Sequence, residues 1–107
     1  MEKNVIYISP EIKEIIPVYI ERRKKDLMVM HEALSKNDLE IIKKLGHKIK
    51  GTGSLYNLDK ISAIGKELEI AAKNNKPEHI KKIIEEFSDF LNNLEIKIVT
   101  NDENKPK

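Results

Sequence analysis

Apolar residues recur at helical spacing along most of the chain, and proline, asparagine and serine interrupt the pattern. Ser9 followed by Pro10 is typical of an N-cap and a first helical residue, which predicts a short helix over residues 10–16. Pro17 should break or restart that helix, because proline disfavours helical geometry in the residue before it. Longer helices are predicted over about residues 17–34, 38–56, 59–73 and 77–98.

The connections between these segments are short. Ser35 or Asn37 is expected to cap the helix that begins near residue 38, and Asn57 to end it, because asparagine tolerates a left-handed backbone. Only VIYI, just before Ser9, alternates as a strand would. Short loops favour antiparallel neighbours, so we predict an all-α fold, an antiparallel up-down-up-down four-helix bundle with a short extra N-terminal helix. We expect one domain over residues 1–107, with its core at about 6–98 and a flexible tail at 100–107.

The helix predicted over residues 38–56 contains the run GHKIKGTGSLYN, with three glycines in eight residues. Each glycine costs a helix interior about 0.8–1.0 kcal/mol relative to alanine. An α-helix turns about 100° per residue, which places Ile42, Leu45, Ile49 and Tyr56 about 140–180° from His47. His47 is therefore predicted to face outward. The residues within about 60° of it include Lys43, Lys44, Lys50, Gly51 and Ser54.

This outward face suits the acceptance of a phosphoryl group. An exposed imidazole is largely neutral at pH 7 and nucleophilic. Lys50, three residues on, can neutralise the charge of a phosphoryl group, and Gly51 leaves room for that group and its donor. Gly46 and Gly53 lie on a flank, where they would let a neighbouring helix pack closely. A histidine among lysines is usually part of a solvated face, but such a face gives no reason for a combined glycine penalty of about 3 kcal/mol.

Composition narrows the class of protein. Hydrophobic residues make up 39% and charged residues 36%, and the net charge is +2 from 20 basic and 18 acidic residues. This near balance argues against nucleic-acid binding, which needs a pronounced basic surface. No apolar run approaches the roughly 18 residues of a membrane span, and no signal peptide is evident. The absence of cysteine fits a cytoplasmic protein. The histidines lie in three different predicted helices, so we expect no metal site.

HKIKG, at residues 47–51, resembles the H-x-[LI]-K-G motif of histidine-containing phosphotransfer (HPt) domains. The following L-x-x-I-x-x-x-x-K-E-L-E pattern is also similar to that family, and the resemblance covers roughly residues 6–95. It implies a helical bundle that carries a phosphoryl group on one histidine and passes it between aspartates of receiver domains in a phosphorelay. Two positions depart from the family pattern: Asn57 stands where many members have glycine, and Gly46 where alanine is common.

The resemblance implies that His47 is the phosphoacceptor, Lys50 its charge partner and Gly51 the clearance residue. Its implied partners are receiver domains of response regulators or hybrid histidine kinases, which would supply Mg²⁺ and catalysis. The chain has no Walker motif or other ATP-binding signature, so we expect a phosphoryl carrier and not an enzyme. We also expect a cytoplasmic monomer without cofactor, nucleic-acid or membrane partners. The expected docking residues are Lys43, Lys44, Lys48 and Ser54, with Ile12, Ile15 and Ile16 as apolar candidates.

Two other functions were weighed against phosphotransfer. The first is a non-catalytic helical adaptor that binds receiver or kinase domains without accepting phosphate, but His47, Lys50 and Gly51 are all present on one face. The second is a homodimeric bundle that binds a metal or ligand, but no inward-facing set of carboxylates and histidines is apparent.

Overall fold

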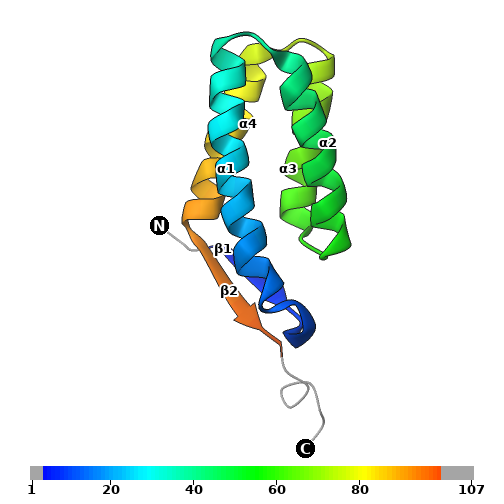
Figure 1. Cartoon of the computed structure of the whole chain (residues 1–107), viewed down its shortest axis with the longest axis vertical. Coiled ribbons are helices and arrows are strands. Elements are labelled where there is room, and N and C mark those ends of the chain that lie inside the picture. The colour runs from blue at the N-terminus through cyan, green and yellow to red at the C-terminus, as the bar shows by residue number, and fades with distance from the viewer. Residues whose placement is uncertain (1–3, 100–107) are drawn as a thin grey trace, which may run out of the picture.

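The computed structural model describes residues 4–99, which are mostly helical (Figure 1). In chain order its strands and α-helices are β1 (Asn4–Ile8), α1 (Ile15–Ser35), α2 (Leu39–Leu55), α3 (Asp59–Lys73), α4 (Pro77–Asn92) and β2 (Leu94–Ile98). α1 contacts α2 and α4, and α3 contacts the same two helices, so the four close a ring around one core. All four contribute its largest fully buried side chains: Ile16, Met30, Ile42, Ile49, Ile61, Leu68, Ile80, Ile83, Ile84 and Phe87.

The short helix predicted over residues 10–16 is wrong in its extent. A single turn of 3-10 helix, Pro10–Ile12, follows Ser9, whose hydroxyl accepts a hydrogen bond from a backbone N–H of that turn. α1 then begins at Ile15, so Pro17 lies inside its first turn. Proline is tolerated there because the first N–H groups of a helix have no intrahelical partner. Pro17 therefore belongs to the start of the long helix and does not break it.

α1, α2 and α3 are each followed by an asparagine in the left-handed conformation. The φ angle is 56° at Asn37, 60° at Asn57 and 56° at Asn75. In each case two backbone N–H groups bond back to carbonyls of the last helical turn, which are the hydrogen bonds of a Schellman motif. The role predicted for Asn57 is confirmed. The expectation that Asn37 or Ser35 caps α2 is wrong, because Asn37 terminates α1 and Asp38 occupies the N-cap position.

The last predicted helix is too long. α4 ends at Asn92, and residues 94–98 form β2, which pairs in parallel with β1 and places Ile6 opposite Ile96. Within β2 the apolar residues alternate with Glu95 and Lys97, which is the period of a strand. Ile6 and Ile96 pack against the helical core, so the apolar face of the sheet extends that core. Because of these two strands the fold is mostly, but not purely, helical.

Glycine allows α2 and α3 to pack with their backbones in contact. A Cβ added at Gly46 would lie 2.7 Å from the backbone nitrogen of Glu69, and one at Gly53 would meet the α3 backbone equally closely. From the other side, Gly65 of α3 lies against the backbone of Lys50. Side chains at these positions would force the two helices apart. The packing role predicted for Gly46 and Gly53 is confirmed.

The strands lie at one end of the bundle, beside the start of α1 and the end of α4 (Figure 1). Within the described residues, no helix has both the length and the apolar character needed to cross a membrane. The flexible tail expected at 100–107 lies outside the described residues.

Candidate functional site

His47 projects outward from α2 and meets a carboxylate of α3. Its side chain is 69% exposed, and its Nδ1 lies 3.0 Å from Oε2 of Glu69. α3 comes this close because Gly46, the residue before the histidine, packs directly against the backbone of Glu69. The glycine at position 46 therefore helps to bring the imidazole and the carboxylate within hydrogen-bonding distance.

Lys50, one turn further along α2, contacts the same carboxylate. Its Nζ lies 3.2 Å from Oε1 of Glu69, so the two carboxylate oxygens contact two different side chains of α2. The hydrogen bond from Lys50 is the main cause that lowers the pKa of Glu69, and the bond from His47 lowers it further, while desolvation acts in the opposite direction. Glu69 is therefore ionised at neutral pH.

The contact with Glu69 determines the tautomer of His47. An ionised carboxylate can only accept hydrogen bonds, so Nδ1 must carry the proton. In the neutral ring, Nε2 then keeps its lone pair free. Because Nδ1 faces α3 and the ring is largely exposed, Nε2 lies on the side away from Glu69. The site thus presents a nucleophilic nitrogen that need not lose a proton before it reacts.

Gly51 differs from the other glycines of this region. Among the described residues, no atom that could obstruct a Cβ at this position lies within 4 Å of it. Gly46, Gly53 and Gly65, in contrast, are all required by the close packing of α2 on α3. Helix packing therefore does not explain the propensity cost of Gly51.

Of the four polar residues expected to dock a partner, only Lys48 lies on another side of α2 from His47. Lys44 and Ser54 are exposed. Lys43 is half-buried, and its Nζ lies 3.5 Å from a carboxylate oxygen of Glu40. Lys48 is exposed and lines a groove between α1 and α2, whereas His47 faces α3. Lys48 is therefore set apart from the face that carries His47.

The three isoleucines named as apolar docking candidates differ in accessibility. Ile16 is fully buried in the core and is wrong as a docking residue, because a partner cannot reach it. Ile12 is half-buried and packs against the core. Ile15 is 46% exposed and lines the same groove as Lys48. Of the three, Ile15 is the residue most available to a partner.

Glu69 and Gly65 are not among the site residues predicted from the sequence. The two lie one turn apart on α3, so they share the face that meets α2. Glu69 belongs to the K-E-L-E pattern, but a motif on one helix does not reveal which acidic residue of the next helix faces it. A signal was present in Gly65, because a glycine inside a helix often marks a close approach of another backbone. Glu69, four positions after Gly65, lies on the same face of α3 and therefore also faces α2.

The two other histidines lie on other helices. His31 is exposed on α1 and His79 is exposed on α4. Across residues 4–99, no three histidine, aspartate or glutamate side chains are grouped so that they could hold a metal ion. His31 therefore provides a matched control for substitutions at His47.

A comparison with protein-family models matches residues 14–97 to the Hpt domain. The matched segment covers most of the chain and includes His47, Lys50, Gly51 and Glu69. No curated protein and no solved structure matches the chain.

Proposed function

Because the chain belongs to the Hpt domain family, whose members are phosphotransfer modules of two-component signalling, we propose that it carries a phosphoryl group on Nε2 of His47. The donor or acceptor is an aspartate of a receiver domain. The observation that carries this assignment is the 3.0 Å contact between Nδ1 of His47 and Glu69, which in the neutral ring places the proton on Nδ1 and leaves the lone pair of Nε2 free on an exposed side chain.

No proton has to be added or removed in the transfer step. Nε2 of His47 attacks the phosphorus of the receiver's aspartyl phosphate, an N–P bond forms, and the P–O bond to the aspartate breaks. The aspartate carboxylate leaves with the electron pair. The imidazole ring gains positive charge as it reacts, and the ionised Glu69 at Nδ1 stabilises that charge in the way a carboxylate supports a catalytic histidine. The reverse step returns the phosphoryl group to an aspartate.

Lys50 and Gly51 complete the proposed site. Lys50 holds Glu69 in place through its 3.2 Å contact, and it lies one helical turn from the phosphoryl group that His47 would carry. Gly51 leaves the outward face of α2 open at the next position along that turn. A larger side chain there would stand where the donor domain has to approach.

The partner receiver domain contributes the rest of the chemistry. It would bind the Mg²⁺ that neutralises the transferring group, so this chain acts as a carrier and needs no cofactor of its own. We assign docking to Lys44, Lys48 and Ser54, with Lys43 at the edge and Ile15 as an apolar contact. The lysines would meet an acidic receiver surface. The proposal also includes a monomeric, cytoplasmic module whose helices run alternately up and down, which its short connections support.

The test is phosphotransfer from a radiolabelled phospho-receiver that labels the native chain. His47→Gln should accept no label, whereas His31→Gln, which alters an exposed histidine on α1, should accept it at the native rate. The label should be acid-labile and stable in base, as expected of phosphohistidine. Label that persists on His47→Gln would contradict the assignment. A receiver that binds the native chain but never transfers phosphate would favour the adaptor function.

A further inference from the structure

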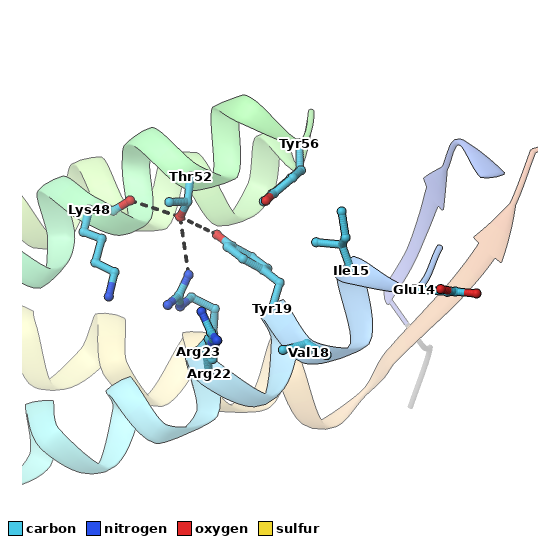
Figure 2. A pocket seen from close by; sticks show the side chains of 9 residues that line it. All are labelled: Glu14, Ile15, Val18, Tyr19, Arg22, Arg23, Lys48, Thr52 and Tyr56. Carbon is cyan, nitrogen blue, oxygen red and sulfur yellow. Dashed lines mark hydrogen bonds between the residues drawn. The ribbon is translucent and has the colours of Figure 1, made fainter. Parts of the chain in front are cut away.

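A groove of about 420 Å³ runs between α1 and α2, on the side of α2 away from α3 (Figure 2). Its volume falls within the range of about 300–1,000 Å³ that is usual for small-molecule sites. His47 does not line it and instead contacts Glu69 of α3. The groove is therefore a second surface feature, distinct from the phosphoacceptor.

The packing of the bundle explains why a groove lies here. α2 and α3 touch backbone to backbone through glycine, but large side chains stand between α1 and α2. Tyr19 and Arg23 of α1 reach across to Thr52 of α2, as Figure 2 shows. They hold the two helices apart on this side, and the space beside them remains open to solvent.

A hydrogen-bond network makes the floor of the groove rigid. The hydroxyl of Thr52 donates to the carbonyl oxygen of Lys48, at 3.0 Å. A hydroxyl has one proton, so Thr52 must accept from the Tyr19 hydroxyl at 2.9 Å and from Nη1 of Arg23 at 3.4 Å. The Arg23 guanidinium also lies over the Tyr19 ring, 4.5 Å from its centroid. These groups are held in place before any ligand arrives.

Arg23 is a charged side chain in an unusually buried position. It is only 2% exposed, and Asp26 accepts a hydrogen bond from its Nε at 2.9 Å. Hydrogen bonds within residues 4–99 engage Nε and Nη1, and no buried side-chain nitrogen or oxygen of these residues lacks a hydrogen-bond partner. A buried guanidinium is costly unless it is paired, and Asp26 already pairs Arg23, so an anion in the groove would be held mainly by Arg22 and Lys48.

The groove has a cationic end and an apolar end. Arg22, Arg23 and Lys48 line one part, and Figure 2 shows their side chains on the same side of the Tyr19 ring. Ile15 and Val18 line the other part and are 46% and 53% exposed. Among the described residues that line the groove, the one carboxylate is that of Glu14, which lies beyond the apolar end and points away from the cations (Figure 2). An occupant with a negative head and an apolar body would match both ends.

We propose that the α1–α2 groove binds a small organic anion, with a phosphate-monoester or carboxylate head and an aromatic or aliphatic body. The head lies among Arg22, Arg23 and Lys48, where charge-assisted hydrogen bonds are strongest. The body lies against Ile15 and Val18. The proposed site is separate from the phosphoacceptor, because neither His47 nor Glu69 lines the groove. It shares Lys48 and Ile15 with the receiver-docking residues proposed above, so a bound anion should compete with receiver docking.

Phenyl phosphate, benzoate, inorganic phosphate and phenol separate the contributions of head and body. Each is titrated into the isotopically labelled full chain, and amide and tyrosine-ring NMR signals are followed. Of the three tyrosines, Tyr19 and Tyr56 line the groove, so their ring signals should shift while those of Tyr7 should not. Phenyl phosphate and benzoate should saturate the groove signals at concentrations at least about tenfold below those required by inorganic phosphate or phenol.

Surface variants identify the residues that bind the anion. Arg22→Gln and Lys48→Gln should each weaken phenyl phosphate binding about tenfold or more, because each removes a charged donor. Lys81→Gln, an equivalent change at an exposed position of α4, should leave the affinity unchanged. Val18→Glu should weaken binding by adding a carboxylate at the apolar end. Arg23 is left intact because its replacement would disturb the buried network.

Several results would overturn the site. They are the absence of saturation by any probe, affinities that Arg22→Gln and Lys48→Gln do not change, or shifts spread over lysines of all helices. Two further results would assign the groove to another occupant and reject the small anion. Shifts that depend on protein concentration alone would indicate a second copy of the chain, and shifts caused only by a receiver domain would indicate a docking surface.

Discussion

Glu69 of α3 lies 3.0 Å from Nδ1 of His47, and its second carboxylate oxygen lies 3.2 Å from Nζ of Lys50. One acidic side chain thus connects the proposed phosphoacceptor to its proposed charge partner. The hydrogen bond directs the proton of the imidazole to Nδ1 and leaves Nε2 available. The contact on which the proposed function rests therefore joins two helices, although the motif that contains His47 and Lys50 lies on one.

Replacement of Glu69 should slow phosphotransfer while the bundle stays folded. Glu69→Ala should reduce the rate about 10- to 100-fold, which is the usual effect of losing the second partner of a functional histidine. Glu69→Gln should be milder, because its amide oxygen can still accept from Nδ1. Nitrogen NMR of the imidazole should show the Nδ1–H tautomer in the native chain and a larger Nε2–H fraction in Glu69→Ala.

Glu67→Gln is the matched control, because Glu67 is exposed on the same helix two residues away. It should leave both the transfer rate and the imidazole tautomer unchanged. A native rate in Glu69→Ala would remove Glu69 from the mechanism. An unchanged tautomer combined with a slower rate would show that Glu69 acts through charge alone.

Lys50→Ala should slow phosphotransfer by no more than about fivefold, because exposed ion pairs contribute about 0.2–1 kcal/mol. If Lys50 acts by holding Glu69, the double variant Lys50→Ala/Glu69→Ala should be no slower than Glu69→Ala alone. If it acts directly on the phosphoryl group, the two effects should add, and the phosphohistidine should hydrolyse faster. Lys73→Ala, at an exposed position of α3, controls for the loss of one surface charge.

The glycines should respond to substitution in opposite ways. Gly51→Ala should raise the free energy of unfolding by up to about 1 kcal/mol, because a methyl group fits there and alanine favours the helix. Gly46→Ala and Gly65→Ala should each lower it by about 1–3 kcal/mol, because the added Cβ would collide with the facing backbone. Denaturant unfolding measures all three.

Gly51→Gln separates the role of Gly51 in clearance from its effect on stability. It should keep the gain in helix propensity but slow transfer from a receiver, because its longer side chain obstructs the approach to His47. A small phosphate donor such as phosphoramidate should be affected less than a receiver domain. Equal rates of transfer from the receiver in Gly51→Gln and the native chain would refute the clearance role.

The lowered pKa of Glu69 predicts a pH dependence of stability. Because folding lowers this pKa below its ordinary value of 4.5, the ionised carboxylate favours the folded state. That contribution is fully present above the ordinary value and is lost as the pH falls through the lowered one. The difference in unfolding free energy between the native chain and Glu69→Gln should therefore shrink on acidification, whereas the corresponding difference for Glu67→Gln should change less.

Local signals predicted the helices better than their ends. The four long helices follow from apolar spacing. The role of Asn57 in ending α2 follows because few residues tolerate a positive φ. The end of α4 was missed because Leu94 and Ile98 also continue a helical stripe, and only pairing with β1 reveals them as a strand. Strand pairing joins residues about 90 positions apart, so no local pattern can predict it.

By itself, the sequence determined that the chain is helical and that His47, Lys50 and Gly51 lie on the outward face of one helix, because helical periodicity alone places them there. It also determined that Gly46 and Gly53 admit a neighbouring helix. Tertiary structure alone decided that Glu69 is the residue opposite His47, and that a groove stays open between α1 and α2. The register and separation of two packed helices depend on every side chain between them, so such contacts cannot be derived from either helix alone.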